Sequence, residues 1–199
     1  TTLELEPDEA GTDLCGSCTL CIQACPTGAI TEPYVVDAGR CISYLTIELR
    51  GTEPPIAEDL RRELGNRIFG CDDCLDACPW NRFAVESREM TFHARATVFE
   101  KRLRDFLVLD DDGFRSLFAK SPIKRIKRAR FLRNVCVALG NTGNREDLPA
   151  LENAAADADT QRRDLVLVVF PFFRSHHPDT DPALAAYATN IESCQRLDQ

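Results

Sequence analysis

The fold of this chain is decided by one stretch, Cys15-Gly-Ser-Cys18-Thr-Leu-Cys21-Ile-Gln-Ala-Cys25-Pro26. Gaps of two residues let a single turning loop present three thiolates to three irons of a [4Fe–4S] cubane, while the fourth cysteine points away and serves another cluster. The proline after Cys25 keeps the loop from closing back on itself. The spacing therefore predicts an iron–sulfur protein with more than one cluster.

A second cysteine motif, from Cys71 to Pro79, departs from the first. A full copy would carry another cysteine at position 77, where this chain has Ala77. Two cubanes need eight thiolates and the two motifs supply seven, so the isolated Cys41 completes the number. The expected ligand sets are Cys15, Cys18, Cys21 and Cys78 for the first cluster, and Cys25, Cys41, Cys71 and Cys74 for the second.

Two other uses of ten cysteines in 199 residues fit less well. A disulfide framework suits a small secreted domain, but the acidic residues 1–13 hold no apolar stretch that could act as a secretion signal. Zinc takes four ligands, usually from paired CxxC or histidine motifs, and no histidine lies near these cysteines in the sequence. Cys136 is expected to be a buried helix residue, and Cys194 has no partner motif.

The composition is that of a globular chain without a membrane segment. Apolar residues make up 44% and charged residues 28%, and the net charge is −8. The longest apolar run, Leu165 to Phe173, contains Pro171 and is too short to cross a bilayer. Reduced, metal-binding thiols predict a cytoplasmic protein. Because the first residue is Thr1 and the only methionine is Met90, we expect residues 1–13 to be the end of an upstream domain.

Three parts follow along the chain, and together they predict an α+β fold. Residues 14–80 form a two-cluster ferredoxin-like domain, residues 81–120 a helical connector, and residues 121–199 an all-α domain of HEAT-like repeats. One short helix is expected to end near Gly65, and another to carry the stripe Phe99, Leu103, Phe106 and Leu107. A third has the apolar face Leu132, Val135, Cys136 and Leu139, a stop at Gly140 and a turn over 141–144. Further helices are expected over 148–155, 165–170 and 183–191.

One basic segment interrupts this acidic chain. Residues 113–145 hold nine bases and no acid. Seven of the bases fall within 14 residues: Lys120, Lys124, Arg125, Lys127, Arg128, Arg130 and Arg133. A regular helix through all of them would put Arg125 and Arg128 on the apolar stripe, so we expect the helix to begin after about Lys127, behind a basic loop. Such a loop suits phosphate oxygens, whereas a solvated helix face, the alternative, usually mixes both signs of charge.

Further motifs carry a resemblance to one family. They are Arg40-Cys-Ile-Ser-Tyr-Leu-Thr-Ile-Glu48, Arg67-Ile-Phe-Gly-Cys-Asp-Asp-Cys74, Cys78-Pro-Trp-Asn81, Ser121-Pro-Ile-Lys-Arg125, Arg133-Asn134 and Ala138-Leu-Gly-Asn141. Together with the first cysteine motif, they resemble the epoxyqueuosine reductases over most of the chain. A generic ferredoxin has neither the lone Cys41 nor the Cys-Pro-Trp-Asn ending.

The resemblance implies a cobalamin-dependent reductase that removes the epoxide oxygen of epoxyqueuosine at the tRNA wobble position. Two [4Fe–4S] clusters would pass electrons from an unidentified donor to cobalamin, in a monomeric enzyme. The family's N-terminal domain binds cobalamin and carries the acidic proton donor, so this chain would be the C-terminal portion and hold no catalytic residue. Ser43 and Asp72 would contact cobalamin, or else cap loops. The tRNA contacts would come from Lys124, Arg125, Lys127, Arg128, Arg130 and Arg133.

Two other functions use similar clusters. A stand-alone two-cluster ferredoxin would carry electrons and dock a protein partner through its helical tail. A cobalamin-dependent reductive dehalogenase would share both clusters. Neither explains seven bases gathered in one short segment, which favours the tRNA-modifying reductase.

Overall fold

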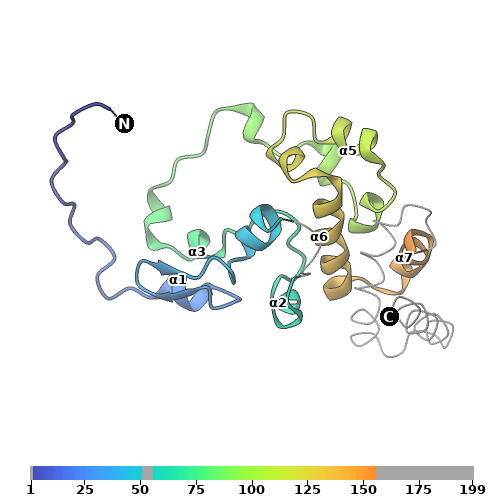
Figure 1. The fold of residues 1–199 in the computed structure, drawn as a ribbon, viewed down its shortest axis with the longest axis horizontal. Coiled ribbons are helices and arrows are strands. Elements are labelled where there is room, and N and C mark those ends of the chain that lie inside the picture. Colours follow the sequence, from blue (N-terminus) through green and yellow to red (C-terminus); the bar gives the residue numbers. More distant parts are fainter. Residues whose placement is uncertain (1, 51–55, 156–199) are drawn as a thin grey trace.

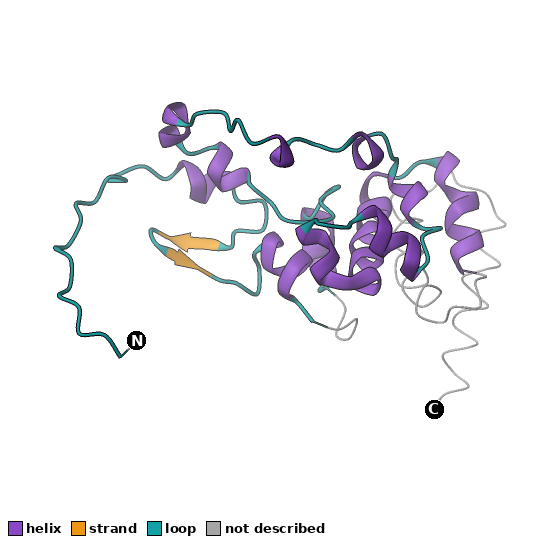
Figure 2. Ribbon diagram, turned by 90° about the horizontal axis from the view of Figure 1, so that it is seen from above, coloured by secondary structure: helices purple, strands orange, loops and turns teal. Residues whose placement is uncertain are grey.

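The computed structural model describes residues 2–50 and 56–155, which are rich in helices and contain one small sheet (Figures 1 and 2). The α-helices of this part are α1 (Leu20–Ala24), α2 (Glu58–Glu63), α3 (Asp73–Asp76), α4 (Ala96–Phe99), α5 (Asp111–Leu117), α6 (Lys127–Thr142) and α7 (Leu148–Ala155). Single 3₁₀ turns form η2 (Pro79–Phe83), η3 (Met90–Phe92), η4 (Leu103–Phe106), η5 (Pro122–Ile126) and η6 (Arg145–Asp147), and η1 (Tyr44–Glu48) is a π-helical turn. None of the helices in these ranges is long and apolar enough to cross a membrane.

The first part of the cysteine-bearing segment, residues 14–41, is built from short elements around few buried side chains. Strands β1 (Ile30–Glu32) and β2 (Val35–Val36) pair antiparallel. Helix α1 packs beside α3 and also contacts β1 (Figure 1). Thr27 and Ala29, between α1 and β1, are buried. A segment with so small a core needs further cross-links, such as bonds from thiolates to a metal.

The main core surrounds α6. The ring of Phe131 lies 5.3 Å from that of Phe106 in an edge-on arrangement, and 5.5 Å and 4.9 Å from those of Phe114 and Phe118. Phe131 itself has no exposed surface. Aromatic rings packed at these separations add attraction to the area that they bury, so α6 is anchored to η4 and α5.

The start of α6 agrees with the prediction and its end does not. The helix begins at Lys127, but it runs through Gly140 to Thr142 and ends at Gly143. The added turn carries Asn141, whose amide donates to the carbonyl oxygens of Arg61 (2.6 Å) and Gly65 (2.9 Å). These bonds to the neighbouring α2 outweigh the tendency of glycine to end a helix. The predicted turn over 141–144 is shortened accordingly.

The short helix predicted before Gly65 is confirmed as α2. It is closed by Leu64, which has no exposed surface, and by Gly65, whose φ of +56° is a left-handed conformation that favours glycine.

The helical connector predicted over 81–120 stays a prediction as a unit, and within it the structure has short, separate helical turns followed by α5. Residues 81–110 form single turns joined by loop, which Figure 2 shows as one long, largely irregular path. Phe99 is 80% exposed, whereas Phe106 and Leu107 of the same predicted stripe lie in the core. Four apolar residues at helical spacing cover only about two turns, and a helix that short is marginal without packing along its whole length.

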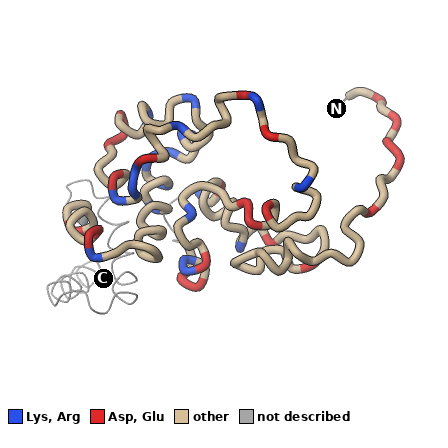
Figure 3. Tube along the Cα trace, turned by 180° about the vertical axis from the view of Figure 1, so that it is seen from behind, with Lys and Arg blue, Asp and Glu red and all other residues tan. Residues whose placement is uncertain are grey.

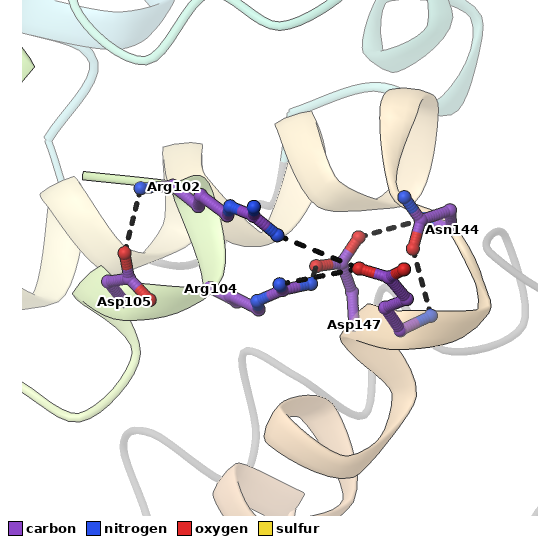
Figure 4. A network of polar contacts seen from close by, with 6 residues as sticks. Arg102, Arg104, Asp105, Asn144 and Asp147 are labelled. Carbon is purple, nitrogen blue, oxygen red and sulfur yellow. Dashed lines mark hydrogen bonds and ion pairs between the residues drawn. The ribbon is translucent and has the colours of Figure 1, made fainter. Parts of the chain in front are cut away.

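A network of ion pairs connects η4 to the start of α7 (Figure 4). Arg104 contacts the carboxylate of Asp147 at 2.8 Å, and the Asn144 N–H donates to the same carboxylate at 2.8 Å. The bond to Asp147 is the main cause that raises the pKa of Arg104. The contacts fix η6, and therefore the direction in which α7 begins.

Helices α6 and α7 follow one another as the first expected helix pair. The helices predicted over 165–170 and 183–191, and Cys194, lie outside the described residues. The HEAT-like repeat and the domain boundaries stay predictions.

Candidate iron–sulfur centre and basic surface

Four predicted cluster ligands surround one cavity. Its volume is about 240 Å³, and it is lined by Cys15, Cys18, Cys21 and Cys78 together with Leu14, Pro79, Trp80 and Arg82. Cys21 lies on α1 and Cys78 lies between α3 and η2, so the packing of α1 against α3 brings the two motifs together. These four thiols are the set predicted for the first cluster.

The loop that carries Cys15 is shaped by Asp13. The Asp13 carboxylate accepts the N–H groups of Cys15 (2.8 Å) and Gly16 (3.3 Å) and the hydroxyl of Tyr34. The bond from Tyr34, followed by the two backbone bonds, holds the pKa of Asp13 below its usual value. Gly16 has φ of +52°, which turns the chain between Cys15 and Cys18 in a conformation that glycine adopts readily.

The second predicted ligand set comes from α1, η1 and α3. Cys25 follows α1, Cys41 precedes η1, and Cys74 lies on α3. Burial raises the pKa of the Cys74 thiol, and the charges of Cys25 and Cys41 raise it further, so these two cysteines lie within electrostatic reach of Cys74. Cys71 is held close to the start of η1 by two hydrogen bonds between its backbone and the Ser43 hydroxyl.

Hydrogen bonds to the sulfur of Cys25 favour its thiolate form. Burial raises the pKa of Cys25, but backbone N–H groups led by that of Ile30 outweigh it and leave the pKa below the usual value. The N–H of Ala29 lies 3.2 Å from this sulfur. Donors of this kind stabilise a thiolate, which is the form that binds iron. Burial instead raises the pKa of Cys71.

The donor set fits a cubane better than a single ion. Within residues 2–50 and 56–155, no three side chains of His, Cys, Asp or Glu converge closely enough to hold one metal ion. Zinc would require four ligands on one atom. A cubane binds each thiolate through a different iron, so its ligands surround a space, as they do here.

The basic segment is divided between surface and interior. Lys120, Lys124 and Lys127 are exposed, and the exposed Arg125 pairs with Glu48 at 2.7 Å. Figure 3 shows basic residues around the α5–α6 side of the molecule and acidic residues along the N-terminal segment. The loop-and-helix arrangement predicted for the segment is therefore present as η5 and α6.

Three arginines of the segment, Arg128, Arg130 and Arg133, face inward. Arg128 and Arg133 are only 7% and 4% exposed. Arg128 lies 3.6 Å from Asp111, and Arg133 donates to the carbonyl oxygen of Leu45 at 2.7 Å. Arg130 is half-buried and bonds to the backbone of η1. Arg130 and Arg133 thus join α6 to η1 in the cysteine-bearing segment, whereas Arg128 joins it to the start of α5. The tRNA contacts expected of these three arginines stay a prediction.

Comparisons with known proteins agree with this geometry. Residues 14–81 match the family model described as a 4Fe-4S double cluster binding domain. An epoxyqueuosine reductase from Yersinia pestis is 44% identical over 160 residues, which are 80% of this chain and 37% of that protein. A solved epoxyqueuosine reductase from Bacillus subtilis is 29% identical with a TM-score of 0.77, and the match covers 95% of this chain and 48% of that one. A solved epoxyqueuosine reductase with a tRNA-Tyr epoxyqueuosine-modified tRNA stem loop is 29% identical with a TM-score of 0.77, over 94% of this chain and 47% of that one.

The chain is similar to epoxyqueuosine reductases over most of its length. The resemblance predicted from its motifs is confirmed. The chain spans less than half the length of these epoxyqueuosine reductases.

The two residues that the resemblance assigned to cobalamin differ in their surroundings. The Ser43 hydroxyl accepts the N–H of Cys71 at 3.0 Å and donates to the Cys71 carbonyl at 3.2 Å, so its one proton is used within the protein. This is the loop-capping alternative. Asp72 is exposed, and its side chain does not cap α3, so its carboxylate is accessible to a ligand.

Several supporting residues were not foreseen from the sequence. Arg67 pairs with Asp73 at 2.5 Å, which braces the loop before α3. Thr46 and Asn134, both without exposed surface, bond to backbone groups far away in the chain. Partners distant in sequence leave no local pattern; the one signal was the presence of Arg133-Asn134 among the family motifs.

Proposed function

We propose that this chain is the electron-transfer and tRNA-contacting part of an epoxyqueuosine reductase, which reduces epoxyqueuosine in tRNA to queuosine. The cavity surrounded by four thiols from two motifs carries the proposal, because it matches what a cubane needs. The similar reductases supply the reaction. The enzyme would act as a cytoplasmic monomer that takes electrons from a separate donor.

Two [4Fe–4S] clusters are proposed, one for each ligand set. Cys15, Cys18, Cys21 and Cys78 would hold the first, and Cys25, Cys41, Cys71 and Cys74 the second. A cubane whose four irons all carry thiolates transfers electrons but has no open position for substrate. The chain would therefore relay electrons, and the N–H donors around Cys25 would help to set the potential at which the second cluster does so.

Cobalamin is proposed as the group that receives these electrons and supplies the reductive chemistry. Most of its binding site, and the acid that protonates the leaving oxygen, are assigned to the part of the relatives that this chain does not span. Asp72, exposed beside Cys71, is the residue of this chain proposed to contact it. No catalytic residue is assigned within the chain.

The exposed half of the basic segment is proposed to bind the tRNA backbone. Lys120, Lys124, Arg125 and Lys127 lie on and around η5, where their positive side chains can meet phosphates. The solved relative with a tRNA stem loop supports RNA as the partner. Contacts would be to the backbone and to RNA shape.

The test is to join this chain to the remaining part of a relative and to measure conversion of epoxyqueuosine-containing tRNA with cobalamin and a chemical reductant. We expect turnover by the joined protein and none by the 199-residue chain alone. Cys78→Ala should abolish turnover, whereas the matched variant Cys136→Ala should retain it. An inactive joined protein that holds its iron and binds tRNA would contradict the proposed function. Turnover by the chain alone would contradict the proposed division of labour.

A further inference from the structure

Helix α6 reaches both segments that carry second-cluster ligands through one buried side chain. The amide of Asn134 donates to the carbonyl oxygen of Thr46 at 2.8 Å and to that of Ile68 at 3.0 Å. The first carbonyl lies in η1, shortly after Cys41, and the second lies in the loop that leads to Cys71. Asn134 therefore holds the two ligand-bearing segments at a set distance from each other.

Thr46 joins the same two segments a second time. Its buried hydroxyl donates to the carbonyl oxygen of Ile42 at 2.7 Å and accepts the N–H of Gly70 at 2.9 Å. The bonds between Ser43 and the backbone of Cys71 form a third connection. The residues that adjoin Cys41 are thus fastened to those that adjoin Cys71 by bonds largely shielded from water, where each bond counts for more.

The position of η1 at the end of a short helical segment explains why α6 supplies so many donors. The last carbonyl oxygens of a helix have no N–H partner further along it, so the carbonyl oxygens near the end of η1 depend on other partners. Three successive carbonyl oxygens of η1, those of Leu45, Thr46 and Ile47, accept from Arg133 (2.7 Å), Asn134 (2.8 Å) and Arg130 (3.0 Å). The turn after Cys41 is therefore held in place by α6.

We infer that Asn134 and Thr46 are positioning residues for the second cluster: they set the spacing of Cys41 and Cys71 without touching the metal. The inference rests on the proposed function in taking these cysteines as ligands of one cluster. A cubane accepts thiolates only at fixed corners, so loosening this pair weakens the second cluster and leaves the first intact.

The test compares Thr46→Val, which removes the hydroxyl at nearly constant volume, with Thr46→Ser, which keeps it. Each is made in the 199-residue chain loaded anaerobically with iron and sulfide, and also in a Cys78→Ala background that should display the second cluster alone. Iron content and the low-temperature electron paramagnetic resonance spectrum of the reduced protein are measured. We expect Thr46→Val and Asn134→Ala to alter the second-cluster spectrum and to lower iron from about eight towards about four per chain, while Thr46→Ser keeps both.

Leu139→Ala is the matched control, because Leu139 is equally buried in α6 but its side chain can make no hydrogen bond. It should lower the unfolding temperature and leave both cluster spectra unchanged. Unaltered second-cluster spectra in Thr46→Val and Asn134→Ala would overturn the inference, as would equal loss of both clusters in Asn134→Ala and Leu139→Ala. An unsubstituted protein that holds only about four irons would instead refute the two-cluster proposal, and this inference with it.

Discussion

Among single residues, the cysteines differ sharply in their surroundings. Cys136 lies in α6 with 1% of its surface exposed, and burial raises the pKa of its thiol to about 12. Cys25, in contrast, is half-buried and receives N–H donors that lower the pKa of its thiol. Cys136 is therefore a core side chain, whereas Cys25 lies in surroundings that favour a metal-binding thiolate. The predicted burial of Cys136 is confirmed.

Native Cys136 should resist alkylation. At pH 9 an ordinary thiol is about half ionised, whereas a pKa of about 12 leaves roughly one thiolate in a thousand. We expect iodoacetamide to modify Cys136 at least about 100-fold more slowly in the native protein than in denaturant, measured by mass spectrometry of the peptide that contains it. Equal rates in the two conditions would show that the thiol is accessible in the native protein.

Cys41 should be required for one cluster only. Cys41→Ala removes a proposed ligand shared with Cys25, Cys71 and Cys74, so iron should fall from about eight to about four per chain. Cys136→Ala, the control, should leave the iron content unchanged. Iron and sulfide analysis of anaerobically prepared protein decides the matter: full iron in Cys41→Ala would mean that the ligand assignment is wrong.

Among the elements, α6 shows how far a local pattern predicts structure. Its start near Lys127 and its apolar face followed from the spacing of Leu132, Val135 and Leu139, because helical periodicity is a local property. The direction of its arginines did not follow, because Arg133 finds its acceptors in η1, far away in the chain. The stop at Gly140 failed for the same reason: Asn141 bonds to α2 and extends the helix.

The arrangement of the cysteines was more predictable than the fold around them, because the spacing of the cysteines in the sequence indicates the metal group that they bind. The thiols predicted for the first cluster line one cavity, since a loop with two-residue gaps has few ways to turn. The predicted apolar stripe does not extend to Phe99, which is exposed, because the spacing of a few apolar residues does not reveal whether anything packs against them. The π turn after Cys41 had no sequence signal, since its geometry depends on donors supplied by Asn134 and its neighbours.

The anchoring of α6 can be tested with two phenylalanines of opposite exposure. Phe131 has no exposed surface and contacts three other rings, so Phe131→Ala should lower the free energy of unfolding by about 3–5 kcal/mol. Phe99 is 80% exposed, so the matched Phe99→Ala should change it by no more than about 0.5 kcal/mol. Denaturant unfolding followed by circular dichroism measures both; similar losses of stability would contradict the packing of α6 against η4 and α5.

In the whole described molecule, charge is separated along the chain. Acidic residues follow the extended N-terminal segment, and basic residues gather near η5 and the start of α6 (Figure 3). Phosphates would be repelled from the first region and attracted to the second, so an RNA would be oriented as well as bound. Because Arg125 pairs with Glu48, the last residue of η1, the proposed RNA surface also adjoins the turn that follows Cys41.

Binding of tRNA should therefore depend on the exposed lysines and on salt. In Lys124→Glu/Lys127→Glu, two exposed bases that lie among the proposed phosphate-binding side chains become acids, so we expect affinity for a tRNA stem loop to fall at least about tenfold. The slope of log K against log salt should flatten by roughly 0.7–0.9 for each phosphate that the variant no longer neutralises. Arg88→Glu/Lys101→Glu makes the same change in net charge at exposed positions of the connector, and it should bind nearly as the unsubstituted protein does. Fluorescence anisotropy over a range of salt concentrations measures all three proteins. If the two double variants lose affinity equally, net charge alone governs binding, and the surface around η5 is not the RNA site.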